Sequence, residues 1–290
     1  MLRVAYDQAP QFAYWWIDGY ADFDDAQSPR VRDALDRWFA WHRLNQLPEY
    51  AALLARAQRE IVDNVTPTAI CGWTAEAQRR IDVAFEEALP AAAELMLTLT
   101  PAQLRHIERR FKKNQDQMRK DFLQPDLAER KTESLDRAVK RAENLYGRLD
   151  TAQRDRLAAQ LDQSPFDPER WLAERRLRQQ ETLRALTTVA AVARASTDRS
   201  AALVQARAAA RSLAEQMTRS PRADYRAYQQ RVMQANCAAA AGVHNLTTPA
   251  QRQAARAKLK GWEDDLRALA SAADSARLRG GNLPPAIESR

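Results

Sequence analysis

The two cysteines and three histidines carry the most chemically versatile side chains of this sequence. Cys71 and Cys237 lie far apart, so they predict either one structural disulfide, typical of an oxidising compartment, or two buried free thiols that pack as small apolar groups. A zinc site would combine cysteines with histidines, but no C-x₂-C or H-x₃-H pair is present. We therefore expect no metal and no cofactor at His42, His106 or His244.

Four aspartates close to the N-terminus offer a second kind of site, because calcium prefers several carboxylate oxygens. They are Asp18, Asp22, Asp24 and Asp25. The D-x-D-x-D-G order and distal glutamate of a calcium loop are missing. Asp24 and Asp25 directly precede a helix expected to open at Pro29, where the helix dipole favours negative charge. We interpret them as helix-start residues.

Catalytic motifs are missing from the sequence. There is no G-x-S-x-G, no H-E-x-x-H and no local Cys–His dyad. The 7 glycines form neither G-x-G-x-x-G nor a P-loop. His42 lies among aromatic residues and is expected to pack, while His244 is expected near the last carbonyls of a helix. We expect a protein that is not an enzyme.

The basic residues are the remaining candidate for chemistry. The net charge is +7, and residues 101–148 supply +5 of it, with 13 Lys+Arg against 8 Asp+Glu. Such a segment favours contact with anionic partners, including nucleic acid. Interleaved acids such as Glu108, Asp116 and Asp121 are more typical of a solvated helix face, which argues against nucleic acid. The candidate basic surface comprises Arg105, Arg109, Lys112, Lys113, Arg119 and Lys120.

The elements that must position these residues are helices. Six prolines follow a Ser, Thr or Asp, and this pair suits an N-cap followed by the first helical residue. Gln follows three residues after Thr100, Asp150 and Thr248, which predicts capping boxes. The six pairs are Ser28-Pro29, Thr66-Pro67, Thr100-Pro101, Asp167-Pro168, Ser220-Pro221 and Thr248-Pro249.

Helical periodicity fills the segments between these starts. Leu104, Ile107, Phe111, Met118 and Phe122 form one stripe of a 3.6-residue repeat. No alternating strand pattern is present. We predict an all-α, elongated array of about ten helices without a sheet, with helical segments near 9–20, 29–45, 49–64, 67–98 (bent at Pro90), 101–123, 126–148, 151–162, 168–195, 199–219, 221–243 and 249–273.

The composition varies along the chain. Eleven of the 21 aromatic residues lie in the first 50 positions, and aromatic side chains bury the most surface. We therefore expect an aromatic-rich helical part over residues 1–100 that acts as a packing centre. Long charged helices over 101–275 are expected to pack as one continuous body, and residues 276–290 to form a disordered tail.

Several short motifs resemble a proteobacterial lipoprotein family of unknown function. They open with Trp15-Trp16-Ile17-Asp18-Gly19-Tyr20 and Trp41-His42-Arg43, followed by Leu47-Pro48-x-Tyr50. They continue with Arg141-Ala142-Glu143-x-x-Tyr146-Gly147-Arg148-Leu149, Pro165-Phe166-Asp167, Arg178-Gln179-Gln180, His244-Asn245-x-Thr247-Thr248-Pro249-x-Gln251-Arg252 and Asp265-Leu266-Arg267.

The resemblance implies a location and leaves the roles of its motif residues open. Members of that family carry a signal peptide and a lipidated cysteine ahead of the segment matching residues 2–6, where this chain has Met1. We thus expect the mature domain of an envelope lipoprotein in the periplasm of a Gram-negative bacterium, tethered by an N-terminal lipid. The motif residues without a known role are Trp15, Trp16, Asp18, Trp41, His42, Arg43, Tyr146, His244 and Asn245.

A weaker resemblance offers another function. Leu99-Thr100-Pro101-Ala102-Gln103 matches the L-T-x-x-Q motif of periplasmic, ATP-independent helical chaperones. A chaperone of this kind would need Phe111, Met118 and Phe122 exposed, whereas a scaffold would bury them. We expect a non-enzymatic scaffold or binding protein that meets envelope proteins or anionic envelope components through its basic helices. The alternatives are the chaperone and a cytoplasmic nucleic-acid-binding protein.

Overall fold

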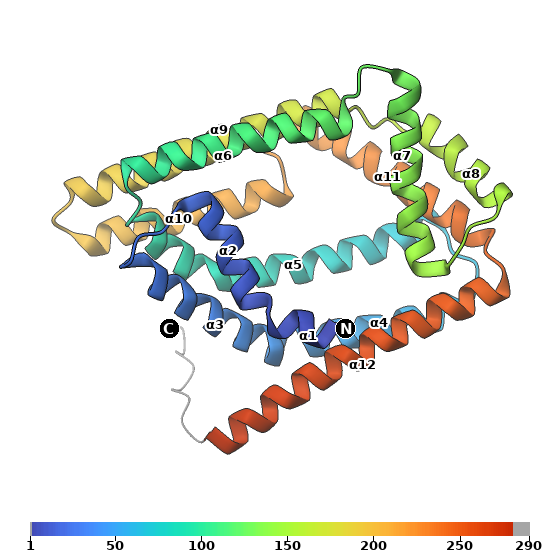
Figure 1. Ribbon diagram of the computed structural model, residues 1–290, viewed down its shortest axis with the longest axis horizontal. Helices are drawn as coiled ribbons and strands as arrows, with labels where there is room; N and C mark the ends of the chain where they lie inside the picture. Colours follow the sequence, from blue (N-terminus) through green and yellow to red (C-terminus); the bar gives the residue numbers. More distant parts are fainter. Residues whose placement is uncertain (1, 281–290) are drawn as a thin grey trace.

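The computed structural model describes residues 2–280, and over that range the chain forms twelve α-helices and no strand (Figure 1). The predicted all-α fold is confirmed, with twelve helices instead of about ten. In chain order they are α1 (Leu2–Asp7), α2 (Ala9–Ala21), α3 (Gln27–Asn45), α4 (Leu47–Glu60), α5 (Pro67–Met96), α6 (Pro101–Phe122), α7 (Leu127–Tyr146), α8 (Thr151–Asp162), α9 (Pro168–Ala195), α10 (Arg199–Thr218), α11 (Ala223–Asn245) and α12 (Pro249–Gly280).

Most of the predicted helix starts are found. Thr66, Thr100 and Asp167 cap α5, α6 and α9, each accepting a hydrogen bond from a backbone N–H of the first turn. The predicted capping boxes form at Thr100, Asp150 and Thr248, where the Gln side chain three residues later accepts from the backbone N–H of the cap. These reciprocal bonds satisfy two orphan donors at each helix start.

Two predicted helix starts are wrong. α3 begins at Gln27, two residues before Pro29, because Asp24 Oδ1 accepts from the N–H groups of Ala26 and Gln27. α11 begins after Pro221, at Ala223. There Ser220 Oγ accepts from the Arg222 N–H in a turn that precedes the helix. In both places a neighbouring polar group organises the backbone in a way that the Ser-Pro pair does not reveal.

Over the described residues the hydrophobic core forms four clusters. The first joins α5, α9 and α10, and the second joins α6 with α9. The third lies between α7, α8 and α11, and the fourth lies where α12 packs along α4. The accessible surface of the chain is 17919 Å², against about 12,500 Å² for a compact protein of this mass. The molecule is therefore less compact than a globular protein of the same mass.

α5 occupies the middle of the molecule, where it packs against α3, α10 and α11 (Figure 1). The pair α6 and α9 forms one long edge, and α4 with α12 forms the opposite one. α2 crosses in front of α5 and contacts α3 and α6. Helices from both ends of the chain thus pack together, and the division at residue 100 stays a prediction.

The predicted disordered tail is partly helical. α12 continues to Gly280, so residues 276–280 belong to this helix. The remainder of the predicted tail, 281–290, lies outside the described residues.

Candidate functional site

The basic residues of α6 form a continuous, solvent-exposed face. Arg105, Arg109, Lys112, Lys113, Arg119 and Lys120 are all exposed. At 100° per residue they fall within an arc of about 120°. None of the six side chains makes an ion pair or a hydrogen bond with another described residue of the chain. We refer to this surface as the α6 basic face.

The opposite side of α6 fixes this orientation. Leu104 and Ile107 are buried in a cluster with Ala190 of α9, and Phe111 packs against the same cluster. Phe122 lies 4.9 Å from the Trp171 ring of α9, measured between ring centroids. Because this apolar stripe is taken up by α9, the cations of α6 must point away from the protein.

Two carboxylates interrupt the α6 basic face. Glu108 and Asp116 are exposed on α6 and form no ion pair within the described chain. They reduce the formal charge of the face from +6 to +4. The interleaving seen in the sequence is therefore real, but the acids do not neutralise the cations by direct pairing.

An exposed aromatic face on α2 was not foreseen from the sequence. Phe12 is 56% exposed, Trp15 56% and Trp16 69%, while Tyr14 and Ala21 of the same helix are buried. Phe12, Trp15 and Trp16 therefore do not join the packing centre predicted for the aromatic N-terminal part. The signal in the sequence was their i, i+3, i+4 spacing on one side of the helix. We call them the α2 aromatic face.

Tyr20 connects the α2 aromatic face to α6. Its ring lies 5.1 Å from that of Trp16 and 6.0 Å from that of Phe111. The Arg110 guanidinium carbon lies 5.4 Å from the centre of the Tyr20 ring, within cation–π range. At the same place His106 Nε2 lies 3.3 Å from the carbonyl oxygen of Gly19. The two faces are therefore held on adjoining helices.

His244 is a structural residue. Its Nε2 lies 2.7 Å from the Asp63 carbonyl oxygen, and its Nδ1 lies 2.8 Å from the Tyr146 hydroxyl. A carbonyl can only accept, so Nε2 carries the proton and Nδ1 accepts from Tyr146. Burial lowers the pKa of His244 and raises that of Tyr146 to about 12. The neutral ring thus joins α7, α11 and the α4–α5 loop.

The following motif residues secure the same loop. Asn245 Oδ1 accepts from the Val65 N–H at 2.9 Å, and its Nδ2 donates to the Val65 carbonyl at 3.0 Å. Arg252 donates to the Val62 carbonyl and to the Asn64 side chain. The motif that spans residues 244–252 therefore acts as a clamp on a loop about 180 positions earlier in the chain.

The motif around Trp41 also has a packing role. His42 is buried between Trp38, whose ring centre lies 4.7 Å away, and Tyr6, whose hydroxyl lies 2.6 Å from His42 Nδ1. Burial lowers the pKa of His42 to about 4, so the ring is neutral. Trp41 packs beside His42, and Arg43 forms an ion pair with Asp7.

The acidic N-terminal stretch supports backbone turns. Asp18 Oδ1 accepts from the Phe23 N–H at 2.9 Å, just beyond the end of α2. Asp22 follows α2 in a left-handed conformation with φ 54°. Asp24 organises the start of α3 as described above. Among the described residues no group of three or more Asp, Glu, His or Cys side chains could hold a metal ion.

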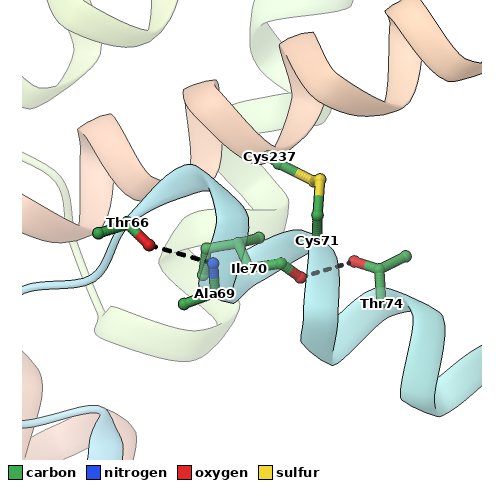
Figure 2. Close-up of a disulfide and its surroundings, with 6 residues drawn as sticks. All are labelled: Thr66, Ala69, Ile70, Cys71, Thr74 and Cys237. Atoms are coloured by element: carbon green, nitrogen blue, oxygen red, sulfur yellow. Dashed lines mark hydrogen bonds between the residues drawn. A yellow bond between two sulfur atoms is a disulfide. The ribbon is translucent and has the colours of Figure 1, made fainter.

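The cysteines form a disulfide. Cys71 lies near the start of α5 and Cys237 lies in α11, with Cα atoms 5.5 Å apart (Figure 2). The Thr66 hydroxyl oxygen accepts from the Ala69 N–H, and the Thr74 hydroxyl donates to the Ile70 carbonyl, which holds the first turns of α5 on either side of Cys71. The disulfide thus fixes α11 across the beginning of α5.

A buried ion-pair network is the strongest electrostatic feature of the interior. Glu174 of α9 is buried and accepts two hydrogen bonds from Arg222, at 2.6 and 2.9 Å, and one from Arg178 at 3.0 Å. Burial alone would raise the pKa of Glu174, but hydrogen bonds from Arg222, Ser220 and Arg178 lower it to about 2. Arg222 also pairs with Glu181. Because its charged groups are paired with one another, we interpret this network as structural.

Of the nine motif residues without a known role, seven have structural partners. Asp18, Trp41, His42, Arg43, Tyr146, His244 and Asn245 pack against or bond to other helices and loops, as described above. Trp15 and Trp16 are exposed, and neither indole N–H donates to another described residue. These two residues and the α6 basic face are therefore candidates for contact with a partner.

Comparison with known proteins identifies a family whose function is unknown. A family model described as a family of unknown function (DUF6279) matches residues 19–209, from the end of α2 into α10. No curated protein and no solved structure matches the chain. Within residues 2–280 no helix is both long and apolar enough to cross a bilayer.

Proposed function

The chain belongs to the DUF6279 family of unknown function, and from its own surfaces we propose that it is a non-enzymatic helical binding protein. It takes an anionic partner on the α6 basic face. The observation that supports this most is the gathering of six exposed cations within an arc of about 120° on one helix. None of the seven Lys and Arg side chains of α6 makes an ion pair within the described residues.

The packing of α6 favours a scaffold over a holdase chaperone. Phe111, Met118 and Phe122 are all partly buried, and Phe111 and Phe122 pack against α9. A chaperone that used this stripe would have to present it to clients. The L-T-x-x-Q segment has a structural use as well, since Thr100 and Gln103 form a capping box.

A binding role is also favoured by the state of the buried ionisable groups. Glu174 is held by Arg222 and Arg178, and Glu263 by Arg267 and Gln58. His244 is bonded at both ring nitrogens. General acid–base catalysis needs a group free to exchange a proton with a substrate, and these groups are already engaged by the fold.

We propose that this protein lies in the periplasm, at the cell envelope of a Gram-negative bacterium, held by an N-terminal lipid. The resemblance to a proteobacterial lipoprotein family is the main support. The disulfide between Cys71 and Cys237 agrees with this location, because disulfides persist in oxidising compartments. The partner on the α6 basic face is then an acidic envelope protein or an anionic envelope component.

Binding of inorganic polyphosphate, a simple linear polyanion, tests the α6 basic face. The variant Arg109→Gln/Lys112→Gln/Lys113→Gln should bind at least tenfold more weakly, with a shallower dependence on salt. The matched control Arg176→Gln/Arg207→Gln/Arg256→Gln removes the same charge from exposed positions on α9, α10 and α12 and should bind like the wild type. Equal losses in both variants would show a nonspecific effect of net charge and contradict the proposal.

Two further measurements test the biological setting. The intact mass of the protein from its native envelope, without reductant, should show an added diacylglycerol group and the loss of two hydrogens. Two free thiols and no lipid would contradict the envelope location. Tighter binding of duplex DNA or RNA than of polyphosphate at equal charge would instead favour the nucleic-acid alternative.

A further inference from the structure

The α2 aromatic face has a composition suited to an interface between water and lipid. α2 contains a single charged residue, Asp18. Trp15 and Trp16 present apolar rings whose indole N–H groups are free within the described structure. Trp38 and Trp73, in contrast, donate their indole N–H groups to the Ala84 carbonyl and the Glu60 carboxylate. A side chain with one apolar and one polar end is favoured where headgroups meet hydrocarbon.

The size of this face limits what can cover it. From their exposed fractions, Phe12, Trp15 and Trp16 offer about 400 Å² of aromatic surface. A specific protein–protein interface buries about 800 Å² on each partner, so the face alone is too small for a stable dimer. An area of about 400 Å² is nevertheless within the range of functional surface patches. A soft lipid surface requires no matched protein shape.

The charge beside the α2 aromatic face indicates which lipid surface is suitable. Tyr20 links Trp16 to Arg110 of α6, and the α6 basic face begins on the same helix. Amphipathic surfaces that pair aromatic residues with Lys and Arg bind the interface of anionic membranes. The unpaired cations are complementary to lipid phosphates, while the indoles are suited to the headgroup level of the bilayer.

We propose that the α2 aromatic face and the α6 basic face together dock the protein onto an anionic phospholipid bilayer. Trp15 and Trp16 lie in the headgroup region, and the α6 cations contact lipid phosphates. The inference rests on the proposed anion-binding role of α6, and it identifies the anion as a lipid headgroup. Docking at this surface orients the body of the molecule against the membrane, which a flexible lipid tether alone does not do.

Vesicle binding provides the test, with phosphatidylcholine vesicles prepared with and without phosphatidylglycerol. The wild type should bind the anionic vesicles and bind neutral ones weakly. Trp15→Ala/Trp16→Ala should weaken binding to anionic vesicles at least tenfold. The control Val204→Ala/Met217→Ala removes exposed apolar side chains from α10 and should leave binding unchanged. Circular dichroism and the urea midpoint should match the wild type for both variants.

Quenching by brominated lipid shows directly whether the indoles meet the bilayer. Trp15 and Trp16 are exposed, whereas the other five tryptophans, at 38, 41, 73, 171 and 262, are partly buried. Brominated acyl chains should therefore quench wild-type fluorescence, and Trp15→Phe/Trp16→Phe should lose most of that quenching while still binding vesicles.

The contrary outcomes separate this inference from the proposed function. Vesicle binding that depends on the α6 cations but not on Trp15 and Trp16, without quenching, would overturn the docking role and leave anion binding intact. Binding of polyphosphate without binding of any vesicle would do the same. Failure to bind either probe would overturn both. Concentration-dependent dimerisation that Trp15→Ala/Trp16→Ala abolishes would identify the face as a contact between copies of the chain.

Discussion

Gln153 and Gln251 donate to each other through their side-chain amides. Gln153 Nε2 lies 2.7 Å from Gln251 Oε1, and Gln251 Nε2 lies 3.0 Å from Gln153 Oε1. Each amide oxygen also accepts from the cap of its own helix, Asp150 or Thr248. Each amide nitrogen donates once more, to a loop carbonyl. Two capping boxes are thus joined back to back with every amide donor and acceptor used.

The same arrangement recurs at the other end of the molecule. Gln103, in the capping box of α6, donates to Gln27 Oε1, and Gln27 donates back to Gln103 Oε1 at 3.3 Å. Gln27 likewise accepts from the Asp24 backbone N–H. Capping glutamines that satisfy a helix start therefore also fix the starts of two helices against each other, α3 with α6 and α8 with α12.

Replacing one glutamine of the pair should be costly. Gln153→Ala removes the partners of the Asp150 N–H and the Leu246 carbonyl and both bonds to Gln251, and an unsatisfied buried polar group costs about 1–3 kcal/mol. We expect the free energy of urea unfolding to fall by about that amount. Gln117→Ala, which removes an exposed bond to Asp121, is the control and should change it by less than about 0.5 kcal/mol. Similar losses in both variants would contradict a special role for the pair.

The disulfide should contribute strongly to stability. It closes a sequence separation of 166 residues, which corresponds to about 5 kcal/mol in the chain-entropy model. Cys71→Ser/Cys237→Ser should therefore unfold at much lower urea concentration than the oxidised wild type. Adding reductant should lower the wild-type midpoint and leave that of the variant unchanged. A wild type that is indifferent to reductant would show that the bond does not stabilise the fold.

Acid should destabilise the protein through Glu174. Its pKa is about 2 in the folded chain, against an ordinary value of 4.5. A depressed carboxyl pKa stabilises the folded state above pH 4.5, and this contribution is lost as the pH falls from 4.5 toward 2. The shift corresponds to about 3 kcal/mol. Unfolding free energies measured across this window should show a weaker pH dependence for Glu174→Gln, and an unchanged slope would refute the assignment.

His42 should make the free energy of unfolding depend on pH in a higher range than Glu174 does. Its pKa falls from 6.5 to about 4 because the ring is buried. The unfolded chain takes up the proton first, so stability declines as the pH falls from 6.5 to 4, by up to about 3 kcal/mol. His42→Gln should flatten that part of the curve, whereas Glu174→Gln should affect only the lower window. An identical slope for wild type and His42→Gln between pH 6.5 and 4 would exclude this role.

The tautomer of His244 offers a spectroscopic check. The Asp63 carbonyl requires a donor at Nε2, so Nδ1 accepts from Tyr146. Long-range ¹⁵N correlation spectra at pH 8 should show a neutral ring with the proton on Nε2. Tyr146→Phe removes the bond to Nδ1 and should shift that nitrogen resonance while leaving Nε2 protonated. A ring protonated at Nδ1 would contradict the arrangement of the clamp.

The local features of the fold were accessible from the sequence because they depend on short-range chemistry. A capping residue, a proline in the first turn and an apolar stripe all act within one helix, and so the starts of α5, α6 and α9 were predicted at the correct residues. The starts predicted at Ser28 and Ser220 were wrong because Asp24 already begins α3 before Pro29, and because Ser220 Oγ closes a turn with the Arg222 N–H ahead of α11.

The surfaces were harder to predict, because exposure depends on which helices happen to meet. Phe12, Trp15 and Trp16 are typical core residues by composition, and only the contacts of α2 with α3 and α6 leave them in solvent. The pairing of Cys71 with Cys237 was likewise one of two open interpretations. Only the packing of α11 across α5 decides between them.

The position of the disulfide has a consequence for a chain exposed to proteases. A single cut anywhere between residues 72 and 236 divides the backbone, but both pieces remain one covalent molecule through Cys71 and Cys237. The loops after α8, α9 and α10 all fall in this interval. With its apolar contacts divided among four clusters, a nicked molecule keeps the two halves of each interface at high effective concentration. The disulfide thus holds the fragments of a cleaved chain together, in addition to stabilising the intact fold.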